Sequence, residues 1–307
     1  MQRYIAGRLI QCLVTLLVIS LLVFALARLT GNPLDVMMPI DASAELQEEM
    51  SRELGLDQPM YVQYARFVQS LLYGDLGTSI RTRKPVAELI GQRLPNTLKL
   101  VSFSTGMALV IALPLGVIAA TRKGGLWDVG ARTVALFGQS VPTFWAGIVL
   151  ISIFAVNLDV LPAGRKEGIE SYVLPAVTLG LFGFMLAGVV RLLRGSMLDV
   201  LDSEYVKFAR LKGLGESVVT WKHALKNALI PVVTFVGFYF GILMAGSVVV
   251  ETVFAWPGIG RLAFEAVQWR DYPVIQGVVL LVSTIILAAN LVVDILYAYI
   301  DPRIRYG

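Results

Sequence analysis

The sequence predicts an all-α integral membrane protein with about six transmembrane helices, and three observations support this. The 307 residues are 56% hydrophobic and only 16% charged, whereas a soluble domain carries about 25% charged residues. The mean hydropathy is +0.72. Six apolar runs are each long enough, at ~1.5 Å per residue, to cross a hydrocarbon layer of ~30 Å as a helix. Helices satisfy their own backbone groups in lipid, so each run is expected to be helical.

The first apolar run covers residues 9–29, and its basic beginning also fits a signal peptide. Arg3 and Arg8 precede the run, and the small residues Ala25 and Ala27 near its end resemble a cleavage site. The run is nevertheless about 20 residues long, which is enough to span a bilayer. We therefore expect an uncleaved first transmembrane helix within residues 1–30.

Residues 31–96 are expected to form an extracytoplasmic region with short amphipathic helices. Ser43 can cap a first helix, and Gly55 can end it. Amphipathic stretches at helical spacing follow, together with a turn-rich break. These segments lie at 61–72, 74–79 and 86–94.

Residues 97–307 are expected to form a five-helix core. Its apolar runs lie at 98–120, 134–157, 173–193, 229–250 and 274–299. Six spans place both termini on one side of the membrane. Lysine and arginine are concentrated in the short loops of that side, which the positive-inside rule assigns to the cytoplasm. The loop 194–228 is then cytoplasmic as well.

The residues of common enzyme and metal sites are missing. His223 is the only histidine and Cys12 the only cysteine, which excludes multi-histidine and multi-thiolate metal sites. No lysine is followed by serine or threonine, so the chain carries no P-loop for ATP, and the nucleophile motif GxSxG is absent. We expect no catalytic residue, metal site or cofactor in this chain. The basic residues lie between apolar runs, so no nucleic-acid partner is expected.

The basic stretch 204–231 predicts a compact helix–turn–helix unit on the cytoplasmic face. Its first part is helical in composition, and the glycines at 213 and 215 break it. Ser217 can cap a second helix. A helix lying on the lipid surface would also explain the basic and apolar residues, but it would not explain the paired glycines. The second helix carries an apolar stripe formed by Val218, Trp221, Leu225, Ala228 and Leu229.

Several motifs, in order along the whole chain, resemble one family. They read "GDLGTSIRTRKPV", "SVPTFWAG", "EYVKFARLKGLG", "HALKNALIP", "ETVFAWPGIGRLAFEAV", "RDYPVIQG" and "NLVVDILYAYIDPRIRYG". The chain is similar to ABC-importer permeases of the peptide/nickel family, and within it to the B-type permease of dipeptide/oligopeptide importers. Lys207, Phe208 and Ala209 stand where the broader importer consensus has Glu-Ala-Ala, which separates the chain from sugar-importer permeases. The resemblance implies a type I ABC importer permease fold.

The resemblance also implies roles for particular residues. In this family the cytoplasmic loop inserts a coupling helix into a separate ATPase subunit, and the outer region receives a substrate-binding protein. The ATPase-coupling residues would be Glu204, Ala209, Arg210, Leu211, Lys212, Gly213, Leu214, Gly215 and His223. Contacts to the binding protein would come from Gly74, Asp75, Trp256, Gly258, Gly260 and Arg261.

The implied partners are two ABC ATPase subunits carrying ATP and Mg²⁺, a second homologous permease, and an extracytoplasmic substrate-binding protein. The location is the bacterial cytoplasmic (inner) membrane. Di- or oligopeptides are the expected substrate, with nickel, glutathione and oligosaccharide as alternatives. A secondary transporter is the rival class, and it needs intramembrane charges or discontinuous helices. Asp294, near the end of the last run, is the clearest candidate for such a charge.

Overall fold

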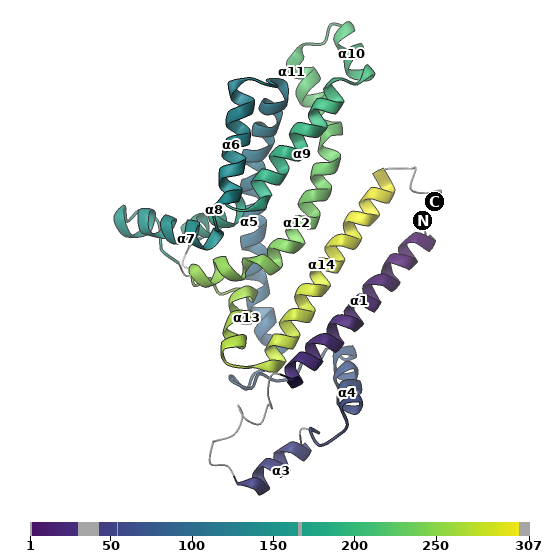
Figure 1. Cartoon of the computed structure of the whole chain (residues 1–307), viewed down its shortest axis with the longest axis vertical. Coiled ribbons are helices and arrows are strands. Elements are labelled where there is room, and N and C mark those ends of the chain that lie inside the picture. Colours follow the sequence, from purple (N-terminus) through teal and green to yellow (C-terminus); the bar gives the residue numbers. More distant parts are fainter. Residues whose placement is uncertain (1, 30–42, 54, 165–167, 301–307) are drawn as a thin grey trace.

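The computed structural model describes residues 2–29, 43–53, 55–164 and 168–300, and apart from turns and one isolated bridge these residues are helical (Figure 1). Helix α1 (Gln2–Leu29) packs against α14 (Tyr272–Ile300), the last helix of the chain. The beginning of α1 and the end of α14 lie at the same end of this pair (Figure 1). The side chain of Asp294 lies outside the described residues.

Two short helices, α3 (Ala44–Glu53) and α4 (Met60–Leu72), lie outside the main helical body (Figure 1). Ser43 accepts a hydrogen bond from the Leu46 backbone N–H at 3.3 Å, and Gly55 follows α3 with φ +64°. Both expected helix boundaries are therefore confirmed. The α4 helix is held to α1 by the hydroxyl groups of Tyr64 and Ser20, 3.0 Å apart.

Helix α5 (Val86–Thr121) is one continuous helix of 36 residues. The sequence indicated an amphipathic piece at 86–94 that leads into a span at 98–120, and the structure joins the two without a break. Pro95 and Pro114 are accommodated inside this helix. The expected limit between the extracytoplasmic region and the core, at residue 96, falls within α5, so this helix belongs to both parts.

The expected span at 134–157 is not one continuous helix, because two helices that meet at a sharp bend replace it. Helix α6 (Leu126–Ser140) is followed by α7 (Thr143–Leu150), which continues as a π-helical segment (Ile151–Asn157), and the two parts meet at 96°. Pro142 stands at the break. Its ring removes a backbone donor and disfavours a helical residue before it, which explains why α6 ends there.

The expected span at 173–193 is also bent. A short 3₁₀ turn (Glu170–Tyr172) leads into α8 (Val173–Leu181), and α9 (Phe184–Leu201) follows at an angle of 52°. The residue at this bend is Gly183, whose φ of +115° is open mainly to glycine.

The two bends lie next to each other. The N–H of Gly183 donates to the carbonyl of Gly138 at 2.9 Å. A Cβ atom on Gly138 would lie 2.5 Å from the carbonyl oxygen of Leu181. Glycine is therefore required on both sides of this contact, which joins α6 to the segment between α8 and α9.

Two further helices complete the core. They are α12 (Leu225–Val253), which is continuous with the helical turns before it, and the short α13 (Ile259–Gln268), which leads to α14. Within the described parts of the chain, four helices are long and apolar enough to cross a membrane, and six segments do so if each bent pair counts as one span. This agrees with the expected six.

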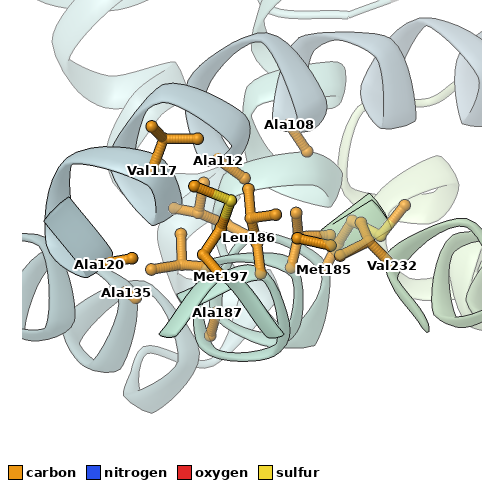
Figure 2. Packing of buried hydrophobic residues seen from close by; sticks show 14 of the residues in the cluster. Ala108, Ala112, Val117, Ala120, Ala135, Met185, Leu186, Ala187, Met197 and Val232 are labelled. Atoms are coloured by element: carbon orange, nitrogen blue, oxygen red, sulfur yellow. The ribbon is translucent and has the colours of Figure 1, made fainter. Parts of the chain in front are cut away.

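The largest buried cluster joins α5, α6, α9 and α12 (Figure 2). Small side chains such as Ala108, Ala112 and Ala187 bring the helices close together, and Met185 and Met197 of α9 fill the space between them. In lipid the hydrophobic effect does not favour helix–helix contact, so van der Waals packing through small residues stabilises this cluster.

Candidate functional site

The stretch that the sequence singled out forms a protrusion at one end of the molecule, here called the cytoplasmic knob (residues 204–224; Figure 1). It consists of α10 (Glu204–Leu211), α11 (Glu216–Val218) and a π-helical turn (Val219–Ala224) that runs into α12. A small buried cluster of Val206, Ala209 and Val219 packs against the end of α9. The knob is thus a folded unit seated on the core.

The turn of the knob is a Schellman motif built on Gly213. The Gly213 N–H donates to the Arg210 carbonyl at 2.9 Å, and the Leu214 N–H donates to the Ala209 carbonyl at 3.4 Å. These bonds satisfy carbonyl groups at the end of α10, and they require a left-handed residue at position 213. Gly213 has φ +79°, as such a cap demands.

Ion pairs hold the two arms of the knob together. Arg210 donates from Nε to Oε1 of Glu216 at 2.7 Å and from a terminal nitrogen to Oε2 at 3.3 Å. Because the pair is bidentate, it fixes the angle between α10 and α11 better than a single contact would. At the start of α10, Lys207 lies 3.1 Å from Glu204 and 3.4 Å from Asp202, and these carboxylates raise the pKa of its ammonium group.

The tip of the knob presents apolar side chains to solvent. Leu211 is 84% exposed, and Phe208 and Leu214, on either side of it along the chain, are also exposed. Lys212 lies with its ammonium group 5.1 Å from the centroid of the Phe208 ring. An exposed apolar tip surrounded by basic residues is typical of a protein-interaction surface rather than of a catalytic site.

The apolar stripe of the second helix is only partly buried. Val218 and Trp221 are exposed, and Val219, Thr220 and Ala224 are buried in their place. The π-helical turn begins directly after Val218, and its i→i+5 bonds fit more residues into a turn, which rotates the side chains that follow. Ser217 does not cap this helix: the N-cap is Gly215, which makes no side-chain bond.

The remaining coupling residues lie within the same unit. Ala209 is buried inside the knob and does not reach its surface. His223 is half-buried at the junction with α12. There the Tyr205 hydroxyl accepts a hydrogen bond from Asn227 at 2.7 Å, which ties α10 to α12.

The residues predicted to meet a binding protein divide into two groups. Gly74 and Asp75 are exposed, and Asp75 accepts a hydrogen bond from the Gly77 N–H at 2.8 Å, which shapes their loop. Trp256, by contrast, is fully buried and donates from Nε1 to the carbonyl of Asn96 at 3.2 Å. A buried indole has no surface for a partner, so its role in this conformation is packing.

Gly258 and Gly260 are buried as well, and their lack of a side chain is a steric requirement. A Cβ on Gly258 would lie 2.3 Å from a carboxylate oxygen of Glu251, and one on Gly260 would lie 2.5 Å from Cα of Val248. Arg261 is half-buried, pairs with Glu265 at 2.8 Å and donates to the Ala255 carbonyl at 2.6 Å.

Sequence reasoning missed Glu251, the carboxylate around which this outer loop is built. Its side chain is fully buried, accepts a hydrogen bond from Thr97 of α5 at 2.7 Å, and accepts another from the Arg261 N–H in the first turn of α13 at 3.0 Å. A carboxylate at a helix N-terminus is favoured by the helix dipole. In the sequence, the feature that could have pointed to Glu251 is an acidic residue at the end of a long apolar run.

Among the residues that the structure describes, no group of three or more histidine, cysteine, aspartate or glutamate side chains could hold a metal ion. A helical membrane core, a folded cytoplasmic knob and a loop-rich outer end are the parts expected of the transmembrane subunit of a transport system.

The family comparisons support this class. The model described as "Binding-protein-dependent transport system inner membrane component" matches residues 112–306, and its N-terminal companion matches residues 1–101. The chain belongs to this family, so it is a multi-pass inner-membrane permease subunit of an ABC importer and not an enzyme. A permease of this family works with ATPase subunits and a substrate-binding protein.

Curated relatives cover the chain from end to end. The glutathione transport system permease protein GsiC of Escherichia coli K12 is 42% identical over 307 residues, which is the full length of both chains. The protein of the same name from Salmonella paratyphi A matches equally well, with 42% identity over the full length.

Two solved transporters share the fold at low identity. One is the MetNI methionine ABC transporter in an inward-facing conformation, with a TM-score of 0.51 at 19% identity over 67% of this chain and 95% of that chain. The other is an amino acid ABC transporter with histidines, with a TM-score of 0.51 at 16% identity over 70% and 94%. They support the type I importer fold and nothing finer.

Proposed function

We propose that this chain is one of two transmembrane subunits of an ATP-driven importer for short peptides, and that the cytoplasmic knob couples it to an ATPase. The observation that carries the proposal is the exposed apolar tip of Phe208, Leu211 and Leu214 on a rigid turn. The chain has no P-loop of its own. The energy of ATP must then reach it through a partner, and the tip is a surface on which a partner can pack.

Coupling requires that force applied to the tip reach the core. Arg210 and Glu216 lock the two arms of the knob, and the π-helical turn continues directly into α12. A displacement of the tip would therefore move α12 and α9 as packed bodies. Rigid-body motion of this kind fits alternating access, in which the cavity opens to one side of the membrane at a time.

The proposed assembly contains a second, homologous permease beside this chain, two ATPase subunits that bind ATP and Mg²⁺, and a substrate-binding protein on the outer side. Exposed large apolar residues on α6 and α7, among them Phe137 and Trp145, leave ample surface for lipid and for a second permease.

Peptides are proposed as the substrate class, with glutathione, itself a tripeptide, as a particular member. The relatives at 42% identity carry glutathione in their names. Nickel is disfavoured because the single histidine, His223, lies on the knob and not in the core. Substrate selection is assigned in large part to the binding protein.

The test is ATP hydrolysis by the complex reconstituted in lipid vesicles with candidate substrate-binding proteins. Each binding protein is loaded in turn with a pool of short peptides, glutathione, a nickel chelate or buffer alone. We expect stimulation by the peptide-loaded or glutathione-loaded protein and none by the other two. Stimulation only by the nickel-loaded protein would contradict the assignment of peptides as the substrate. The absence of any co-purifying ATPase would contradict the coupling role of the knob.

A further inference from the structure

Four basic side chains lie on two neighbouring segments on the outer side of the molecule. Three lie in the loop before α5 and one in the turn between α13 and α14, and all four are exposed. They are called here the outer basic platform and comprise Arg81, Arg83, Lys84 and Arg270. They lie within two of the outer motifs quoted above, "GDLGTSIRTRKPV" and "RDYPVIQG", but none of them was among the expected contacts to the binding protein.

A single buried carboxylate joins the two segments of the platform. Asp271 accepts hydrogen bonds from the Ser79 hydroxyl at 2.5 Å, the Ile80 N–H at 3.1 Å and the Arg81 N–H at 3.4 Å. Its side chain is buried. Segments about 190 residues apart in the chain are thereby held as one surface, because a buried carboxylate with these donors is costly to release.

The positive charge of the platform is only partly neutralised. Lys84 lies 3.8 Å from Glu88. Arg81 stacks on Trp269, with its guanidinium carbon 3.9 Å from the ring centroid, a cation–π contact that orients the group without cancelling its charge. Within the described ranges, neither Arg83 nor Arg270 has an ion-pair partner.

Two arginines of the platform occupy backbone conformations that favour glycine. Arg83 has φ +57° and Arg270 has φ +53°. Arg270 follows the end of α13, where glycine is the usual residue. A non-glycine residue stays in the left-handed conformation only where the surrounding structure stabilises it, and such residues are common at functional sites. Here both strained positions carry exposed positive charge.

The length of α5 places the platform beyond the lipid. Its 36 residues extend for about 54 Å, whereas a bilayer with its headgroups is about 40–45 Å thick. Arg122 and Lys123, directly after the cytoplasmic end of α5, fit the headgroup layer of that side. The loop before Val86 then reaches the outer aqueous phase, where a soluble protein is a better partner than a lipid headgroup.

We propose that the outer basic platform is the docking surface for an acidic face of the substrate-binding protein. This rests on the proposed function, which supplies that partner. Complementary charge steers encounter and orients the complex, while adding less to its lifetime than buried contacts do. The rigid support from Asp271 and Trp269 keeps the charges in place before docking.

The test uses the whole complex in phosphatidylcholine vesicles with the binding protein that stimulates its ATP hydrolysis. The measured quantity is the binding-protein concentration that gives half-maximal stimulation. The double variant Arg83→Gly and Arg270→Gly removes both charges, and glycine accepts the same positive φ, so folding is preserved. We expect the half-maximal concentration to rise about tenfold at low salt, and the difference from wild type to shrink at high salt.

Two variants serve as matched controls. Asp159→Gly relieves the same kind of backbone strain, since Asp159 is exposed with φ +50°, but it removes no positive charge. Arg52→Ala removes an exposed outer cation on α3, outside the platform. Both are expected to behave as wild type.

An unchanged half-maximal concentration in the double variant would overturn the docking role while leaving the importer function standing. A shift that occurs only in vesicles containing phosphatidylglycerol would overturn it too, and would assign the platform to anionic lipid. If the wild-type complex is stimulated by no binding protein, the proposed function itself fails, and the docking role fails with it.

Discussion

At the scale of single residues, two glycines of this chain are required for different physical reasons. Gly213 has open space where a side chain would lie, but its φ of +79° strains any residue with a Cβ. Gly258 has an unstrained φ of −112°, but a Cβ would lie 2.3 Å from Glu251. The first is a requirement of a turn, and the second is a requirement of packing.

The residue-scale prediction concerns Gly213→Val. A β-branched residue in the left-handed region costs about 1–3 kcal/mol, which should reshape the tip of the knob and leave the membrane core intact. We expect normal insertion, ATP hydrolysis within about twofold of wild type, and transport reduced at least about tenfold. The measurement is hydrolysis and uptake side by side in the same vesicles.

The control for this prediction is Gly215→Ala. Gly215 has φ −62° and open space around it, so alanine fits without strain. Normal transport by the Gly213→Val variant would show that the turn is not part of the coupling path.

At the scale of helices, α6 and α9 are bound together at both ends. Near the bends, Gly183 bonds to Gly138 at 2.9 Å. Near the cytoplasmic end, Arg194 of α9 holds the buried carboxylate of Asp128 with two contacts of 2.7 and 2.8 Å. The same carboxylate accepts a hydrogen bond from the Gly124 N–H at 2.9 Å, which fixes the turn between α5 and α6. These helices therefore form one mechanical unit.

The element-scale prediction compares Arg194→Met with Arg132→Met. Both arginines contact Asp128, but the Arg194 side chain is 22% exposed and the Arg132 side chain 46%. Removing Arg194 takes away the bidentate partner of a buried carboxylate, which is strongly destabilising, whereas removing the more exposed Arg132 leaves that pair in place and costs less. We expect Arg194→Met to lower the midpoint of thermal unfolding by about 5 °C or more. Arg132→Met should lower it by less than half as much.

Thermal unfolding of the purified complex in detergent, followed by circular dichroism, measures this difference. Equal midpoints for the two variants would mean that the Asp128–Arg194 contact does not hold the α6–α9 unit together.

At the scale of the whole molecule, α3 and the cytoplasmic knob lie at opposite ends of the long axis (Figure 1), and the helical core separates the knob from the outer basic platform in the loop before α5. Helices α5 and α12 run between them and contact each other, and α12 continues without a break into the knob. The structure does contain the discontinuous helices that a secondary transporter uses. The family match nevertheless identifies an ABC importer permease, so these bends belong to the permease core.

The prediction at this scale is that transport depends on ATP and not on an ion gradient. In vesicles that hold the whole complex and its binding protein, removal of internal ATP should abolish uptake while a proton or sodium gradient is maintained. Dissipation of the gradient with ATP present should leave uptake within about twofold of its starting value. Uptake that follows the gradient would contradict the coupling proposed for the knob.

Much of the fold could be predicted from the sequence because the responsible features are local. Runs of apolar residues predict spans, and α1, α5, α12 and α14 contain four of the six predicted runs. The paired glycines predicted the turn of the knob, which the φ of Gly213 confirms. The bends at Pro142 and Gly183 were not predicted, because proline and glycine are also common inside continuous membrane helices, as Pro95 and Pro114 are in α5.

The sequence by itself determined the class of this protein, because its composition is that of a membrane protein and its motifs are those of the permease family. Only the tertiary structure decided which side chains face outward. In the second arm of the knob, Val218 and Trp221 of the apolar stripe are exposed, whereas Val219 and Ala224 are buried. Glu251 and Asp271 bind segments roughly 150 to 190 residues away in the chain. Local periodicity carries no information about such contacts, because they form only when distant helices pack.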